Sequence, residues 1–222
     1  MPSPAASFAW EQHRAHRVTY AHAKVNHDYG DQHEYTAATG WRLDDHAINL
    51  SAEAPGTPAP DGPFAAAQDV LRRYAFQPPN LIAGYFDPSQ PLGKRVMVLR
   101  AIFLVFNFYS GVQVADVVDA ESQDGPDGPE RVWGHGCSTL EGHFERGQTN
   151  FSVHKSLTTV TVQFCIHAAL QPGHIRNPFY YLIFKLFEWM LQHRFAYESL
   201  ARLRGLVVEA LMQPQHFGAP IS

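Results

Sequence analysis

The chain has 222 residues, which is enough for one large domain or two small ones with a full hydrophobic core. Charged residues make up 17% and the net charge is −4, so there is no electrostatic reason to expect nucleic-acid binding. The two cysteines, Cys137 and Cys165, exclude a disulfide framework and favour a reducing, cytoplasmic location.

The N-terminal part predicts an arm, a strand and a helix. Residues 1–39 are polar and rich in histidine, and we expect an arm outside a single α+β domain over residues 40–222. Residues 40–50 predict a first strand, followed by a connector rich in proline and glycine. A helix follows, with Asp61 as its cap, Pro63 in its first turn and apolar residues at three-and-four spacing up to Tyr74.

The middle of the chain predicts strands joined by short connections. Residues 81–86 predict one strand, and residues 96–109 predict another that is covered on both faces, because apolar residues occupy both parities. The remaining predicted strands cover residues 111–121, 131–139, 149–157 and 158–169. The last shows clear alternation, with Val160, Val162, Phe164 and Ile166 on one face.

A long helix is predicted near the C-terminus. Asn177 and Pro178 are typical of a helix start, and the helix runs to about Arg204, with Gly205 as a kink or end point. The predicted fold is therefore α+β: a curved, mostly antiparallel sheet of about six strands that grips the C-terminal helix. The apolar runs at residues 96–109 and 179–191 are too short for a bilayer, so no integral membrane segment is expected.

The turn at residues 142–147 concentrates reactive side chains between two predicted strands. It places His143, Glu145 and Arg146 between two glycines. In a structural interpretation, the glycines allow a tight hairpin, and Glu145 and Arg146 form contacts between the turn and neighbouring strands. A functional interpretation makes Arg146 a binder of anions or carbonyls, and His143 or Glu145 a proton carrier. The sequence leaves both open.

The same turn resembles the signature of a widespread bacterial and plant family of unknown function, Gly-Thr-Leu-Pro-Gly-His-Pro-Glu-Arg-Gly-Glu-Glu. Both glycines, His143, Glu145 and Arg146 match it, whereas Glu141 and Phe144 stand where the signature has prolines. The resemblance would cover about residues 40–204. More distantly, the order of elements is similar to the helix-grip proteins of the START and pollen-allergen types. That similarity implies an apolar ligand held between the sheet and the C-terminal helix.

A second group of residues has the chemistry of a zinc site. Two pairs at a spacing of two fall on predicted strands of one sheet: His135 with Cys137, and Cys165 with His167. Zinc ligands usually come from turns with two-residue gaps, so we expect no metal. The sequence also lacks the common phosphate, dinucleotide and acyl-transfer motifs, and no cofactor is predicted.

These observations favour a protein that binds a small apolar or amphipathic molecule between the sheet and the C-terminal helix. Phe106, Phe108 and Trp189 are expected to line the pocket, and Arg146 and His143 to lie near its mouth. One alternative is a cofactor-free acid–base enzyme with His143 or Glu145 as its base. Another is a structural or partner-binding protein with a filled core. The sequence makes no prediction of oligomeric state.

Overall fold

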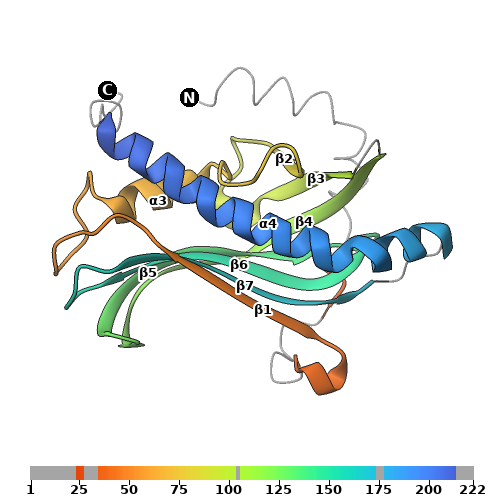
Figure 1. Cartoon of the computed structure of the whole chain (residues 1–222), viewed down its shortest axis with the longest axis horizontal. Helices are drawn as coiled ribbons and strands as arrows, with labels where there is room; N and C mark the ends of the chain where they lie inside the picture. The colour runs from red at the N-terminus through yellow and green to blue at the C-terminus, as the bar shows by residue number, and fades with distance from the viewer. Residues whose placement is uncertain (1–23, 28–34, 104–105, 174–177, 214–222) are drawn as a thin grey trace.

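One antiparallel sheet crossed by a long helix forms the body of the protein (Figure 1). The computed structural model describes residues 24–27, 35–103, 106–173 and 178–213, and for residues 103, 106 and 178–192 it describes the backbone alone. The elements are η2 (Ala37–Thr39), β1 (Arg42–Asn49), α3 (Pro63–Arg72), β2 (Ile82–Phe86), η3 (Leu92–Lys94), β3 (Val96–Phe103), β4 (Phe106–Gly125), β5 (Gly128–Thr139), β6 (Glu145–Ser156), β7 (Val162–Pro172) and α4 (Pro178–Met212).

The sheet has seven strands in the order β1-β7-β6-β5-β4-β3-β2, and every neighbouring pair is antiparallel. Strands β2 to β7 follow one another along the sheet, while β1 pairs with β7 at the far edge. This confirms the predicted α+β class with a curved antiparallel sheet and a long C-terminal helix, with seven strands where about six were expected.

Several strand boundaries differ from the prediction: β4 extends to Gly125 instead of residue 121, and β6 begins at Glu145 instead of residue 149. The run 96–109 is not one strand, because β3 pairs back onto β4 with Phe103 opposite Phe106. Residues 103–106, where the chain reverses, are all apolar, so the sequence pattern did not reveal the hairpin. β7 begins at Val162 rather than Thr158, and Val160 is 53% exposed instead of lying on the buried face.

The helix α3 has Pro63 in its first turn, as predicted, but Asp61 is not its cap. The N-cap is Gly62, whose side chain offers no acceptor. The carboxylate of Glu53 takes that role: it accepts hydrogen bonds from the backbone N–H of Phe64 at 3.2 Å and of Ala59 at 2.6 Å. Ten residues upstream of the helix start, this acceptor was outside the local pattern that predicts caps.

The helix α4 is continuous over 35 residues, so Gly205 does not end it. The predicted cap Asn177 lies outside the described residues. Ala196, Ser199, Leu200, Leu203 and Val207 are buried, and their three-and-four spacing forms the stripe that faces the core. No described helix is long and apolar enough to cross a membrane.

The core lies between α3, α4 and one face of the sheet (Figure 1). Alternate residues of each strand point into it, among them the predicted set Val162, Phe164 and Ile166 of β7. Aromatic rings dominate its centre, and Phe76 contacts Phe151 with ring centroids 4.8 Å apart. The sheet face toward α4 is therefore the interior side of the molecule.

Candidate functional site

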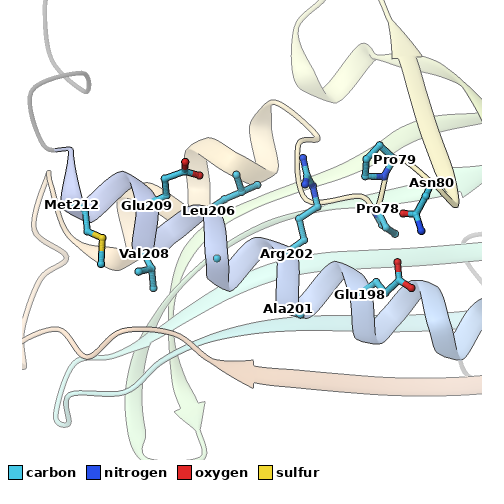
Figure 2. A pocket seen from close by; sticks show the side chains of 11 residues that line it. Pro78, Pro79, Asn80, Glu198, Ala201, Arg202, Leu206, Val208, Glu209 and Met212 are labelled. Carbon is cyan, nitrogen blue, oxygen red and sulfur yellow. The ribbon is translucent and has the colours of Figure 1, made fainter.

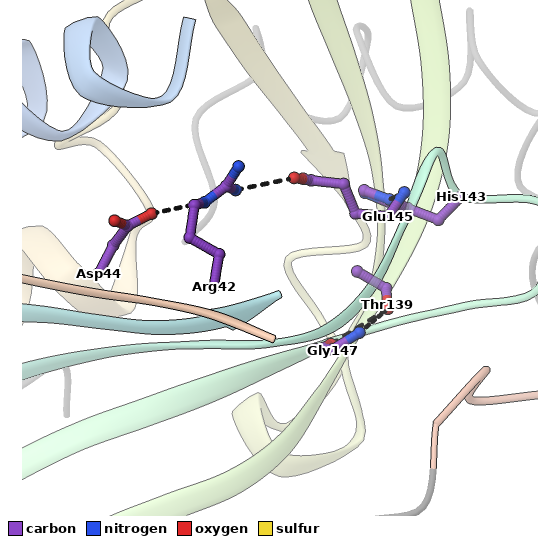
Figure 3. A network of polar contacts seen from close by, with 6 residues as sticks. All are labelled: Arg42, Asp44, Thr139, His143, Glu145 and Gly147. Carbon is purple, nitrogen blue, oxygen red and sulfur yellow. Dashed lines mark hydrogen bonds and ion pairs between the residues drawn. The ribbon is translucent and has the colours of Figure 1, made fainter. Parts of the chain in front are cut away.

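The turn singled out in the sequence joins β5 to β6, and geometry explains its glycines. Gly142 and Gly147 have φ of 86° and 134°, which disfavour residues with a side chain. A Cβ at Gly147 would also overlap the carbonyl oxygen of Ala169 on β7. The hydroxyl of Thr139 accepts a hydrogen bond from the N–H of Gly147 at 2.9 Å (Figure 3). The two glycines thus allow a close approach of backbones.

His143 interacts with the backbone of its own turn. Its Nδ1 accepts a hydrogen bond from the N–H of Glu145 at 2.9 Å, which leaves the proton of the neutral ring on Nε2. Burial lowers the pKa of His143 to about 4, although the residue keeps partial contact with solvent. The imidazole is therefore neutral at pH 7.

Glu145 contacts β1 on the side of the sheet that faces α4. Its carboxylate pairs with the guanidinium of Arg42 at 3.3 Å, and Arg42 pairs in turn with Asp44 at 2.9 Å (Figure 3). Further along β1, the ring of His46 packs edge-on against the rings of His193 and Tyr197 of α4. The ring centroids are 5.8 and 5.7 Å apart, respectively. Since alternate strand residues share a face, Arg42 and Asp44 also lie on the α4 side.

Arg146 has different partners from those of Glu145. Both its Nε, at 2.8 Å, and its Nη2 donate to the side-chain oxygen of Gln171 on β7. Its guanidinium also lies 5.7 Å from the centre of the Trp41 ring. His143, Glu145 and Arg146 are thus neighbours in sequence that contact the turn backbone, β1 and Gln171 respectively, and they do not converge on one point.

One other predicted site residue and part of the N-terminal segment contact this turn. Phe108 of β4 contacts Phe144 edge-on, with centroids 5.6 Å apart. Phe106 and Trp189 belong to β4 and α4, but their side chains lie outside the described residues. From the predicted arm, Asn26 donates to the carbonyl oxygens of Leu140 at 3.1 Å and Glu145 at 3.0 Å. Part of that arm therefore holds the turn.

The four residues considered for zinc do not form a site. β6 separates β5 from β7, and the buried His135 and Cys137 lie on the interior face of β5. Cys165 and His167 alternate with the buried Phe164 and Ile166, so they point to the opposite face of the sheet. Within the described residues there is no group of three or more side chains that could hold a metal ion.

The interior holds a group of polar side chains that the sequence did not indicate as a site. We call it the interior polar cluster; its members are Tyr74, Gln77, Arg95, His135 and Cys137, all less than a tenth exposed. The centroids of the Tyr74 and His135 rings are 6.1 Å apart, and Tyr74 and Cys137 each affect the pKa of the other. The charge of Arg95 acts on both His135 and Cys137.

Aromatic residues enclose this cluster. The rings of Trp133, Tyr74 and Phe151 lie around His135, with centroids 5.8 to 6.1 Å from its own. Tyr74 is the one described residue other than glycine with a positive φ, 57°. Opposite its ring stands Gly84 of β2, where a Cβ would come within 2.8 Å of the Tyr74 ring. A strained residue and a glycine thus allow the Tyr74 ring to lie inside.

Several polar atoms of the cluster lack hydrogen-bond partners within the part of the chain that the structure describes. They are Oε1 of Gln77, Nε of Arg95 and both ring nitrogens of His135. The hydroxyl of Ser199, on the inward stripe of α4, is also buried without a partner there. Each such atom costs about 1–3 kcal/mol when it is left unpaired, and more than nine in ten buried polar groups are normally paired.

Burial sets the charge state of the cluster. It raises the pKa of Tyr74 well above its usual value and that of Cys137 to about 12. Burial, helped by the positive charge of Arg95, lowers the pKa of His135 to about 4. Arg95 also has a lowered pKa, because of burial, but a guanidinium stays protonated in proteins. At pH 7 the cluster therefore carries one positive charge among neutral groups.

The sequence contained partial signals for this cluster. The spacing of two in His135 and Cys137 correctly placed both on one face of a strand, but the comparison with zinc ligands led to the wrong partners. Tyr74 was assigned to the apolar face of the helix, which ends at Arg72. Arg95 stands directly before the apolar strand β3, and a cation at a buried position was the signal that could have identified it.

A surface hollow lies on the outer side of α4, against the segment 78–80 (Figure 2). Its lining mixes Leu206, Val208 and Met212 with charged side chains. Arg202 at this hollow donates to the carbonyl oxygen of Ala75 at 3.0 Å, and Glu198 pairs with Arg194 at 2.6 Å. Arg202 and Glu198 are thus engaged in structural contacts.

Solved structures of three proteins are among those similar to this chain. An aromatase/cyclase, Zhui, from Streptomyces sp. R1128 shows 13% identity and a TM-score of 0.47 over 81% of this chain and 99% of that one. A point mutant of norcoclaurine synthase from Thalictrum flavum, in complex with a transition-state analogue, shows 9% identity and a TM-score of 0.46 over 76% and 95%. Ara h 8.0201 shows 9% identity and a TM-score of 0.42 over 77% and 99%.

The family is established by a match that covers most of the chain. No curated protein matches the sequence. The family model "Domain of unknown function (DUF1990)" matches residues 26–202, which confirms the resemblance to a family of unknown function and extends it into the predicted arm. The chain therefore belongs to the DUF1990 family.

Proposed function

We propose that the protein binds a small amphipathic molecule in the interior between the sheet and α4. The observation that carries this proposal is the interior polar cluster, whose polar atoms are buried and lack partners within the described residues. A core with a purely structural role is made of apolar groups or of polar groups that satisfy one another. This cluster meets neither description, and a bound molecule would supply the missing partners.

The surroundings of the cluster suit such a molecule. Ligand sites combine mainly apolar and aromatic walls with a few polar groups that orient the ligand. Here Phe76, Phe151 and Trp133 supply aromatic surface, while Arg95 and His135 supply polar contacts. The apolar body of the ligand would lie against the rings, and its polar end against the cluster.

In this proposal the turn residues stand at one end of the site. His143 and Phe108, together with Phe106 and Trp189, remain the residues that we propose near the mouth. Arg146 alternates with Glu145 on β6 and donates to Gln171, so we do not propose it as a ligand contact. In support, Glu145 and its partner Arg42 lie on the α4 side of the sheet, and Glu145 is held by that ion pair. Free thiols at Cys137 and Cys165 agree with the proposed cytoplasmic location.

The charge states favour binding over acid–base catalysis. A general acid or base works best when its pKa lies near the working pH. His135 and His143 have pKa values of about 4, and that of Cys137 is about 12, so these groups keep their protonation states around neutral pH. Such groups orient a ligand by fixed hydrogen bonds and charge rather than by exchanging protons with it.

Native mass spectrometry of the purified protein, followed by organic extraction, tests the proposal. We expect a co-purifying small molecule that is released on denaturation. The variant His135→Phe would fill the interior with a larger apolar ring and should reduce its retention. His167→Phe changes the same residue type on the opposite face of the sheet and should leave retention unchanged. Equal ligand occupancy in both variants would show that the ligand binds elsewhere. If the purified protein contains no ligand and also takes up no apolar probe, the core is filled by its own side chains.

A further inference from the structure

We infer that the interior site takes an organic anion, with an aromatic or similarly bulky apolar body, and that Arg95 recognises its carboxylate. This inference rests on the proposed function and adds the chemical class of the ligand. It is drawn from the position of one buried cation, from the groups that already contact it, and from the lack of a negative charge beside it.

Arg95 is anchored by neutral groups. It is 8% exposed, and its Nη1 donates to the carbonyl oxygen of Arg72, at the end of α3, at 2.8 Å. Its guanidinium lies 4.1 Å from the centre of the Phe86 ring. These contacts fix the position of the side chain, but they leave Nε without a hydrogen-bond acceptor within the described residues.

No negative charge balances Arg95 inside the described structure. None of the ion pairs among the described residues involves it. Tyr74 and Cys137 are the neighbouring groups that are able to ionise to anions, and burial raises the pKa of both, which keeps them neutral. Buried charges in proteins are normally paired, because an unpaired charge in a low-dielectric interior is costly. A ligand anion would remove that cost.

The neighbouring groups suit the oxygen atoms of such an anion. A neutral imidazole offers one N–H donor, and both nitrogens of His135 lack partners within the described residues. Arg95 and His135 thus each hold a buried N–H that has no acceptor within the described residues. Charge-assisted hydrogen bonds from a guanidinium to a carboxylate are shorter and stronger than those between neutral groups. The aromatic rings around His135 would contact the apolar body.

A matched pair of probes, 2-naphthoate and 2-naphthamide, separates charge from shape. Both have the same fused ring, but only the first carries a negative charge at pH 7.5. Isothermal titration calorimetry of the full chain should give a dissociation constant at least about tenfold lower for the acid than for the amide, since a buried charge-assisted hydrogen bond forms only with the acid. This comparison uses the unaltered protein and does not depend on any variant folding.

Two variants then test the role of Arg95. Arg95→Gln should remove the preference for the acid while the amide still binds. The control is Arg100→Gln, which also removes one positive charge. Arg100 alternates with Met97 and Leu99 on β3, so it lies on the other face of the sheet. This variant should still bind the acid more tightly than the amide. Circular dichroism and the retained binding of the amide would show that each variant is folded.

The outcomes distinguish this inference from the proposed function. Equal affinity for acid and amide in the unaltered protein, or an unchanged preference in Arg95→Gln, would overturn the role of Arg95 and leave ligand binding standing. Absence of binding for both probes, in a protein that also carries no extractable molecule, would overturn the proposed function and this inference with it.

Discussion

Gly142 and Gly147 lie five residues apart, both with positive φ, yet they differ in what surrounds them. A side chain at Gly142 would meet nothing within 4 Å, whereas one at Gly147 would overlap the Ala169 carbonyl and the Trp41 ring. We predict that Gly147→Ala lowers the free energy of unfolding by roughly 3 kcal/mol or more, because backbone strain and overlap add. Gly142→Ala should cost only about 1 kcal/mol, from the strain alone.

Urea denaturation of the two glycine variants and the unaltered protein measures both losses. Equal losses would show that the backbone of β7 does not approach Gly147 as closely as described. The comparison is informative because the two substitutions add the same methyl group to the same turn region.

The buried histidine His135 predicts a loss of stability in acid. Its pKa is about 4 in the folded protein against 6.5 for an ordinary histidine, so the unfolded chain binds the proton first as the pH falls. The contribution of the neutral His135 side chain to the free energy of unfolding is fully present above pH 6.5, and it is lost as the pH falls toward about 4. Between pH 7.5 and 4.5, His135→Phe should therefore lose about 2 kcal/mol less stability than the unaltered protein.

Denaturation curves at the two pH values test this difference. His143 titrates in the same direction and remains in both proteins, so part of the acid sensitivity should persist in the variant. The control is His167→Phe, which removes a half-exposed histidine from the opposite face of the sheet and should leave the acid sensitivity caused by His135 in place. An identical loss in His135→Phe and the unaltered protein would mean that His135 is accessible to protons in the folded state.

At the scale of single residues, the sequence predicted the hairpin glycines but not the interior polar cluster. His143, Glu145 and Arg146 stood out because they are adjacent, yet neighbours on a strand alternate in direction and these contact different partners. The interior polar cluster comes from three separate segments, after α3, before β3 and on β5. Only the pairing of distant strands brings these residues together, and no local pattern contains that information.

At the scale of secondary-structure elements, Gly205 offers a test of α4. It is exposed within a continuous helix, and a Cβ there would meet nothing within 4 Å. We predict that Gly205→Ala raises the free energy of unfolding by about 0.5–1 kcal/mol, because alanine restricts the unfolded chain and favours the helix. The reverse change at exposed Ala201 on the same helix, Ala201→Gly, should lower it by a similar amount.

Thermal or urea denaturation compares these two helix variants. Stabilisation by Gly205→Ala requires that residues on both sides belong to one helix. A loss of stability would instead indicate that Gly205 adopts a conformation reserved for glycine, as the sequence-based expectation of a helix end implied.

Strand periodicity predicted the existence and order of the strands better than their ends. The alternation in β7 identified Val162, Phe164 and Ile166 as buried because one face of that strand faces the core. The hairpin between β3 and β4 escaped detection because both sides and the connection are apolar. In the same way, the cap of α3 was missed because Glu53 acts across a loop rather than from the local cap position.

At the scale of the whole molecule, the sheet and α4 enclose an interior that contains more than apolar packing. The aromatic centre around Phe76 and Phe151 gives the fold its core, and the interior polar cluster lies in contact with it. The arrangement buries one cation, Arg95, and one neutral imidazole, His135, beside this core. The family has no assigned function, so this interior is the feature of the molecule that suggests one.

A crystal structure of the protein as purified, without added ligand, would show whether a ligand occupies the interior. We expect electron density for a non-protein molecule between the sheet and α4, within hydrogen-bond distance of Nε of Arg95 and of a ring nitrogen of His135. If these atoms instead bond to side chains of the protein itself, and apolar side chains fill the space around them, the interior is a structural core and the ligand-binding account is contradicted.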